Sequence, residues 1–157
     1  MTTPVSDLRI RGLAAADLDR VTEIGMNLPH APHWPRWVYE AVLDPAFPKR
    51  VGLVAEMAET GKIAGFVVAG ILLPQAELES IAVSADQQRC GIGRKLLSAM
   101  VEELKAAGAS EFILEVRASN EQARGFYLSL GWRENGRRQR YYTDPEEDAV
   151  LMSRELG

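Results

Sequence analysis

The stretch that decides the fold is Gln88-Arg89-Cys90-Gly91-Ile92-Gly93-Arg94-Lys95-Leu96-Leu97. It follows the apolar triplet 81–83, which is typical of a strand, and it leads into residues with the apolar periodicity of a helix. Glycines at the start of a helix let a ligand approach the backbone, where unpaired N–H groups carry partial positive charge. The stretch therefore predicts an anion site, with Arg89 and Arg94 as further donors.

The spacing of this loop leaves alternatives open. A dinucleotide-binding loop needs a third glycine three residues after Gly93, but position 96 is Leu. A P-loop needs Gly-Lys-Ser/Thr after four spacer residues, and this sequence has no such run. A glycine-rich turn with a purely structural role fits the spacing as well as an anion site does.

Outward from this stretch, hydrophobic periodicity predicts a mixed α/β domain. We expect strands at 8–11, 51–56, 63–72, 78–83 and 112–116, and a closing hairpin at 132–142 and 149–152. We expect helices at 13–28, 37–43, 92–107 and 121–130, of which the last has Asn120 as its N-cap. The order is β-α-α-β-β-β-α-β-α-β-β, in which segment 78–116 requires a parallel crossover.

Length and composition predict one globular domain over residues 1–157. The net charge of −4 argues against nucleic-acid binding and is compatible with a cationic partner. One cysteine and two histidines exclude an intrachain disulfide and predict no metal site. Without an apolar run of membrane-spanning length, we expect a soluble cytoplasmic protein, monomeric or weakly dimeric.

The loop Gln88-x-x-Gly91-x-Gly93 resembles the acyl-CoA pyrophosphate loop of the GNAT superfamily of N-acetyltransferases. Residues 77–152 are most similar to its RimI branch, the ribosomal-protein-alanine N-acetyltransferases. The matching stretches, about half of the chain, are 81–83, 88–97, Leu114-Glu115-Val116-Arg117-Ala118-Ser119-Asn120, Phe126-Tyr127-Leu128-Ser129-Leu130-Gly131-Trp132, 137–138, 141–142 and 147–149.

The resemblance implies the GNAT fold, a central mixed sheet of about seven strands with helices on both faces. It implies acetyl transfer from acetyl-CoA to a primary amine, above all the N-terminal α-amine of a ribosomal protein. Glu115 would be the general base and Tyr127 the acid that protonates the thiolate. The alternatives are an ion pair of Glu115 with Arg117 or another basic residue, and a core aromatic at Tyr127.

The resemblance also implies how the donor is bound. The backbone of strand 81–83 would pair with the pantetheine as an added strand does. The implied cofactor-binding residues are Ile81, Ala82, Val83, Gln88, Arg89, Cys90, Gly91, Ile92, Gly93, Arg94, Asn120 and Tyr127. A nucleophilic role for Cys90 is the less favoured reading, since the superfamily transfers the acyl group directly.

For the acceptor amine, the sequence indicates Trp34, Glu79 and Tyr141. Glu77 or Glu79 is a further candidate for the role of the base. Segment 30–37 departs from the RimI pattern, so the acceptor follows less directly than the reaction. The alternatives are a small-molecule amine or a lysine side chain as acceptor, a non-catalytic acyl-CoA-binding module, and a structural protein bound to the ribosome.

Overall fold

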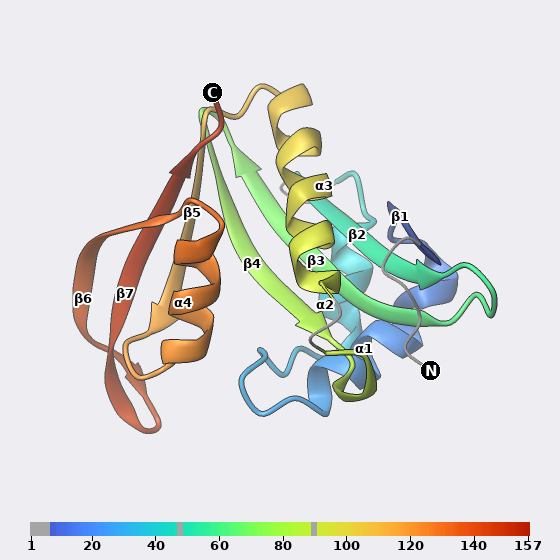
Figure 1. The fold of residues 1–157 in the computed structure, drawn as a ribbon, viewed down its shortest axis with the longest axis horizontal. Coiled ribbons are helices and arrows are strands. Elements are labelled where there is room, and N and C mark those ends of the chain that lie inside the picture. Colours follow the sequence, from blue (N-terminus) through green and yellow to red (C-terminus); the bar gives the residue numbers. More distant parts are fainter. Residues whose placement is uncertain (1–6, 47–48, 89–90) are drawn as a thin grey trace.

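A seven-stranded mixed sheet forms the centre of the molecule, in the order β1-β2-β3-β4-β5-β7-β6 (Figure 1). The computed structural model describes residues 7–46, 49–88 and 91–157. The strands are β1 (Leu8–Gly12), β2 (Arg50–Met57), β3 (Ile63–Leu72), β4 (Gln75–Val83), β5 (Glu111–Arg117), β6 (Arg133–Thr143) and β7 (Glu146–Glu155). The helices are α1 (Leu18–Met26), α2 (Arg36–Val42), α3 (Ile92–Ala106) and α4 (Glu121–Ser129), with short 3-10 helices at Ala15–Asp17 and Ala85–Gln87.

Helices cover both faces of the sheet and bury a core on each. The larger core lies between the sheet and helices α3 and α4, and its centre is formed by Leu96, Met100 and Phe112. The smaller core lies between the sheet and helices α1 and α2, around Tyr39 and Phe66, whose rings meet edge to face at 5.4 Å. In the part of the chain that the structure describes, no helix has the length and apolar character to cross a membrane.

The expected order of strands and helices is confirmed, as is the mixed sheet of seven strands with helices on both faces. Asn120 caps α4 as expected, since its side-chain oxygen accepts a hydrogen bond from the Ala123 N–H at 3.1 Å. Gly108 and Gly131 follow their helices with φ of 96° and 90°, a conformation that glycine adopts without strain. Local signals therefore located these helix ends correctly.

The prediction of one helix over 13–28 is wrong at both ends. The helix α1 spans only Leu18–Met26, although Leu13 and Leu28 both pack against the smaller core. Their near-helical spacing therefore reflects burial on a common face rather than one continuous helix. The predicted start of β4 at 78 is also too late, because the strand begins at Gln75.

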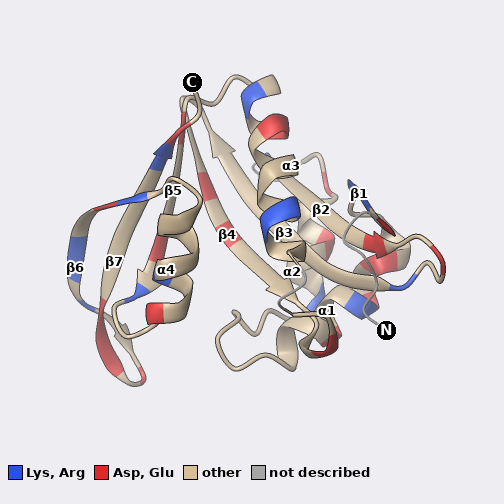
Figure 2. Cartoon of the chain, in the orientation of Figure 1, with Lys and Arg blue, Asp and Glu red and all other residues tan. Residues whose placement is uncertain are grey.

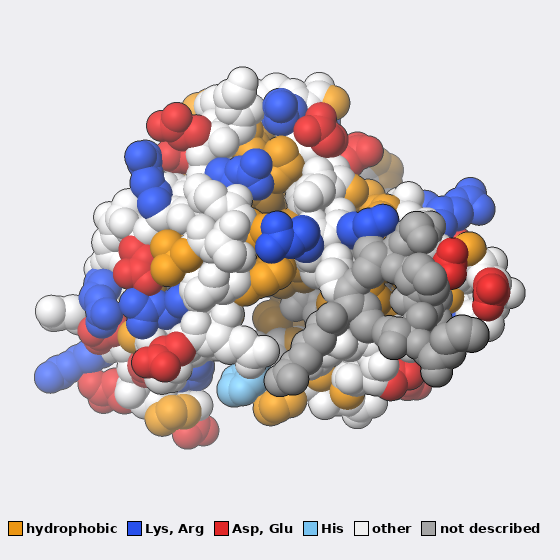
Figure 3. Space-filling model, in the orientation of Figure 1, with side chains coloured by type: hydrophobic (Ala, Val, Ile, Leu, Met, Phe, Trp, Pro, Cys, Tyr) orange, Lys and Arg blue, Asp and Glu red, His pale blue; other side chains and the backbone are white. Residues whose placement is uncertain are grey.

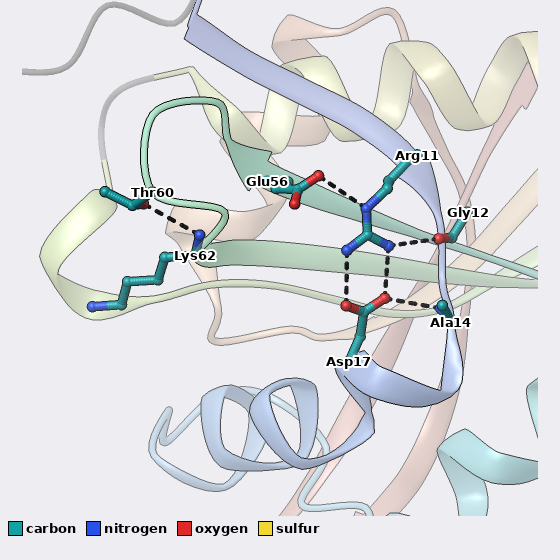
Figure 4. A network of polar contacts seen from close by, with 7 residues as sticks. All are labelled: Arg11, Gly12, Ala14, Asp17, Glu56, Thr60 and Lys62. Carbon is teal, nitrogen blue, oxygen red and sulfur yellow. Dashed lines mark hydrogen bonds and ion pairs between the residues drawn. The ribbon is translucent and has the colours of Figure 1, made fainter.

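The late start of α1 has its cause in a network around Asp17, a carboxylate that is 5% exposed (Figure 4). The two carboxylate oxygens accept hydrogen bonds from the Arg11 guanidinium at 2.8 and 2.9 Å, and one of them also accepts the Ala14 N–H. Arg11 also donates its Nε–H to Glu56 on β2 at 3.0 Å. This network ties β1, β2 and the turn before α1 together, and the Arg11 guanidinium holds the pKa of Asp17 below its usual range.

We predict that Asp17→Asn lowers the free energy of unfolding by about 2–3 kcal/mol at pH 7, because it removes the buried carboxylate of the network and leaves Arg11 with Glu56 as its remaining charged partner. A carboxyl whose pKa is lowered in the folded state stabilises the fold above its unfolded pKa, about 3.9. The difference between wild type and variant should therefore narrow as the pH falls below about 4. Urea denaturation at pH 7 and pH 3 measures both effects.

The matched control is Asp19→Asn, which removes an exposed carboxylate paired with Arg36. Exposed pairs contribute about 0–1 kcal/mol. Equal losses for the two variants would contradict a special role of the Asp17 network.

Candidate active site

The sheet is split between its two central parallel strands, β4 and β5. Their register joins Gln75, Ala76 and Glu77 to residues 111–113, and within the described residues the pairing goes no further. Figure 1 shows the two strands diverging from this point toward their C-terminal ends. A bulge contributes to the bend, because Val68 pairs with Ser80 whereas Ala69 pairs with Leu78, so that Glu79 is an extra residue in β4.

Beyond Glu77, the edge of β4 that faces β5 is no longer paired with that strand. The Ser84 N–H donates to the Ala64 carbonyl of the β3 side at 2.8 Å. Since backbone groups of alternate residues in a strand point to opposite edges, Ala82 also faces β3, whereas Ile81 and Val83 face the split. The side-chain amide of Gln88 donates to the Val83 carbonyl at 3.1 Å, on that same side. Of the three residues expected to pair with pantetheine through their backbone, Ile81 and Val83 therefore face the split and Ala82 does not.

Two helices begin at the open end of this split. Figure 1 shows the N-terminal ends of α3 and α4 next to the C-terminal ends of β4 and β5. Gly91 forms the N-cap of α3 with φ of 78°, and a Cβ at Gly93 would lie 3.4 Å from the Phe126 ring of α4. Figure 3 shows a hollow between α3 and α4, with hydrophobic side chains at its floor. The first-turn N–H groups of a helix have no partners within the helix, so this end favours an anion. The expected contacts of Arg89 and Cys90 lie outside the described residues.

Acidic residues lie along β4 and β5 beside the split (Figure 2), and three of them, Glu77, Glu79 and Glu115, are close enough for their charges to interact. Leu114 and Val116 of β5 belong to the larger core, so Glu115 between them faces the side of α1 and α2. Its Oε1 lies 3.1 Å from the Arg138 Nε of β6. The expected alternative partner, Arg117, pairs instead with Glu147. The charge of Glu115 is therefore balanced by an arginine from the edge strand.

The other two carboxylates, Glu77 and Glu79, differ from each other in their partners. Glu79 accepts two hydrogen bonds from Arg50, at 2.8 and 3.2 Å, so each of its oxygens has a partner. Loss of solvent around Glu77 raises the pKa of its carboxyl, and the charges of Glu115 and Glu79 raise it further. Glu115 also accepts a hydrogen bond from Tyr141, which raises the pKa of that phenol. Tyr141 and Glu115 are thus brought together, whereas Glu79 is held by Arg50.

Tyr127 lies on the other side of the sheet, in the larger core. Its side chain is 8% exposed and its ring packs against Phe126 and Trp132 at 5.4 and 5.6 Å. Burial raises the pKa of Tyr127 to about 12, so the phenol keeps its proton at neutral pH. Glu115 and Tyr127 therefore come from opposite faces of the sheet, and Glu115 lies in the part of β5 that no longer pairs with β4.

The β6–β7 turn is fastened to the end of β5 by Arg117. Its guanidinium donates to the Pro145 carbonyl at 3.1 Å, pairs with Glu147 and lies 4.3 Å from the centre of the Tyr142 ring. Glu147 in turn accepts the Ser119 N–H at 2.9 Å, just before α4. A cleft of about 550 Å³ adjoins this clamp. Its lining residues are Pro29, His30, Arg117, Ser119, Asn120, Glu121, Gln122, Asp144, Pro145 and Glu147.

The loop between α1 and α2 carries the remaining candidate, Trp34. Its ring packs against Tyr39 at 5.4 Å, and the residue joins the smaller core. His33 lies 2.9 Å from the Leu28 carbonyl, within the same loop. These contacts show Trp34 fixing the loop, while His30 reaches the cleft.

The mixed sheet and the helix N-termini beside its split agree with the fold expected for the class of acetyl-CoA-dependent acetyltransferases. The chain belongs to the GNAT family: the model of the acetyltransferase (GNAT) family matches residues 17–132. The chain is 43% identical over 100 residues to the [ribosomal protein bS18]-alanine N-acetyltransferase of Escherichia coli strain K12, covering 62% of this chain and 68% of that protein. A protein of the same name from Haemophilus ducreyi is 33% identical over 147 residues, 92% of this chain and 97% of that one.

Among solved structures, the ribosomal-protein-S18-alanine N-acetyltransferase from Escherichia coli superposes with a TM-score of 0.81 at 32% identity, over 96% of this chain and 94% of that one. The expected resemblance to the GNAT superfamily and its RimI branch is therefore confirmed, and the chain is an N-acetyltransferase.

The sequence did not reveal the arginine partners of the carboxylates. Arg50 and Arg138 lie in other strands, far along the chain from Glu79 and Glu115. One signal was available: a charged residue within an otherwise buried strand requires a counterion. That signal predicts a partner for Glu115 but does not identify it.

We predict that Arg117→Gln loosens the β6–β7 turn without unfolding the protein, because it removes the clamp that holds this turn to β5. Backbone amide exchange at Ser119 and at residues 146–147 should become about five- to tenfold faster. Arg133→Gln, which removes an exposed arginine near the other end of β6, is the control and should leave these rates unchanged. Unaltered exchange in Arg117→Gln would show that the clamp does not hold the turn.

Proposed function

We propose that this protein acetylates the N-terminal α-amine of a protein, and that the alanine N-terminus of ribosomal protein bS18 is its acceptor. The observation that carries the proposal is the split between β4 and β5, with a carboxylate on one face and a protonated phenol in the core on the other. The names of the relatives support the acceptor, because several of them are called [ribosomal protein bS18]-alanine N-acetyltransferase.

The residues beside the split fit acetyl-CoA, which supplies the acetyl group as a reactive thioester. The edge of β4 at Ile81 and Val83 is suited to an extended, amide-containing chain such as pantetheine. The start of α3 at Gly91, with Arg94 in its first turn, is suited to the pyrophosphate. We also assign cofactor contacts to Gln88, Arg89, Cys90, Ile92, Gly93 and Asn120. Ala82 supports this edge through its pairing with β3.

Glu115 and Tyr127 act in this scheme as base and acid. An α-amine has a pKa of about 7.7–8.0, so much of it is protonated at neutral pH and must lose a proton before it can attack a carbonyl. Glu115 accepts that proton, directly or through a water molecule, and the phenol of Tyr127 gives its proton to the departing thiolate. Holding amine and thioester together in the split supplies a further part of the rate.

On the acceptor side, Tyr141 is suited to bind the acceptor backbone next to Glu115, and the α1–α2 loop fixed by Trp34 forms the opposite wall. Glu79 contributes through Arg50 rather than as a free carboxylate. A small-molecule amine or a lysine side chain remains the alternative acceptor, and a non-catalytic acyl-CoA-binding module the alternative function. We assign no nucleic acid or membrane partner.

We predict that a peptide beginning with Ala is acetylated in the presence of acetyl-CoA, and that a lysine peptide with a blocked N-terminus and free polyamines are not. Mass gain of each acceptor measures the result. Turnover of the polyamine or the lysine peptide alone would overturn the acceptor but leave acetyl transfer intact. Binding of acetyl-CoA with no turnover of any amine would favour the non-catalytic module.

We predict that Glu115→Gln and Tyr127→Phe each lower kcat by about 10²–10⁴-fold, the usual contribution of a general base or acid. Acetyl-CoA affinity, measured by calorimetry, should stay within about threefold, since neither change removes the helix N-terminus or the β4 edge.

The chain offers a matched control for each change. Glu111→Gln removes a carboxylate from the same strand, where it accepts from Gln75 at 2.7 Å at the closed end of the split. Tyr39→Phe removes a second buried phenol whose pKa burial raises to about 12. Both controls should keep kcat within about threefold. Equal losses in Tyr39→Phe and Tyr127→Phe would contradict the acid role of Tyr127.

A further inference from the structure

The carboxylate that we assign as the base has a partner that the reaction must displace. Arg138 Nε lies 3.1 Å from Glu115 Oε1, which is ordinary ion-pair contact. Arg138 is 59% exposed, whereas Glu115 is only 22% exposed. The guanidinium is therefore the more exposed partner, and it contacts the carboxylate from the β6 side of β5.

The two arginine–carboxylate pairs on this face differ in how firmly they are built. Arg50 holds Glu79 through two hydrogen bonds, and both side chains are only about a quarter exposed, at 26% and 22%. Arg138 reaches Glu115 by one contact and is more than twice as exposed as Arg50. The Arg50–Glu79 pair is therefore held more firmly. Arg138 can release Glu115 to another cation with little loss of free energy, since exposed pairs contribute about 0–1 kcal/mol.

An irregularity in the backbone of β6 directs two of its side chains toward Glu115. The pairing of β6 with β7 shifts between Arg138 and Tyr142, and Arg140 within the shift has φ of 52°, unusual for a residue with a side chain. Register also places the small Ala149 of β7 opposite Arg138 and opposite Arg117 of β5. The irregularity brings Arg138 and Tyr141 from one edge strand onto a single carboxylate two strands away.

We propose that Arg138 is a placeholder for the ammonium group of the acceptor. This inference rests on the proposed function, because it assumes that Glu115 receives the proton of the amine. Without acceptor, the guanidinium keeps the partly buried carboxylate paired. On binding, the cationic N-terminus takes its place against Glu115, so one positive charge replaces another.

The exchange has consequences for selectivity and for product release. An acceptor without a positive charge would not displace Arg138 from Glu115. The site therefore favours protonated amines over neutral groups of the same shape. The product is an amide without charge, and it cannot compete with the guanidinium. Once Glu115 has passed its proton to solvent, Arg138 pairs with it again and the product is displaced. Arg138 is thus a positioning residue, which acts through Glu115.

The test compares two inhibitors of an Ala-initiated peptide substrate in wild type and in Arg138→Gln. One carries an N,N-dimethylated N-terminus, which is cationic at neutral pH and cannot form a stable amide. The other lacks the amino group altogether. Removing Arg138 should lower the inhibition constant of the cationic peptide about fivefold, near the upper range for an exposed ion pair, and leave that of the neutral peptide within about twofold.

Three further variants complete the design. Arg138→Lys keeps the positive charge and should behave as wild type within about twofold. Arg138→Met removes the charge but keeps an unbranched side chain, and it should give the same selective gain for the cationic peptide, so the test remains decisive if Arg138→Gln folds poorly. Arg133→Gln, at the far end of β6, should change neither constant.

The outcomes separate this inference from the proposed function. If both inhibition constants change by the same factor in Arg138→Gln, or neither changes, or the cationic peptide binds more weakly, Arg138 is not a placeholder. If wild type acetylates no N-terminal amine, the proposed acceptor fails instead. Selective gain for the cationic inhibitor, together with turnover of the peptide, supports both.

Discussion

The parallel pairing of β4 with β5 stops after three residue pairs, and the functional architecture depends on this limit. Parallel strands within a sheet normally satisfy each other's backbone groups along their length. Here the bulge at Glu79 bends β4, and the chain then leads into α3 at Gly91. The resulting edge of β4 is not paired with β5 beyond Glu77, and an edge of this kind can pair with a ligand that has its own amides.

The two faces of the sheet carry different groups beside the split. The face under α3 and α4 holds the helix N-termini and the buried phenol of Tyr127. The other face holds Glu115 with its arginine and tyrosine from β6. A continuous sheet would keep these groups apart, since neighbouring residues of a strand point to opposite sides. In the proposed reaction, separation of the strands lets the acid and the base act from these two different environments.

Much of this arrangement could be predicted from the sequence, and the exceptions share a cause. The glycine loop, the Asn120 cap and the order of elements follow from local residue preferences, which depend on neighbours in the chain. The partners of Glu115 and Glu79 depend instead on strand order, because β7 lies between β5 and β6. The α1 boundary depends on the Arg11–Asp17 network, which no helical period encodes. Contacts that cross the sheet were therefore the ones missed.

In the proposed reaction, Glu115 must be paired before the substrate binds and must then accept a proton, and the position of Arg138 is compatible with both. A carboxylate close to the core is costly to leave unpaired, yet a permanently satisfied carboxylate cannot accept a proton. Glu79 shows the permanent solution, with two hydrogen bonds from Arg50 inside the sheet. For Glu115 the counterion comes from β6, the outermost strand, whose side chains lie toward solvent. An arginine on an edge strand can move into water without disturbing the sheet. Arg138 can therefore release Glu115 for the proposed reaction without lowering the stability of the fold.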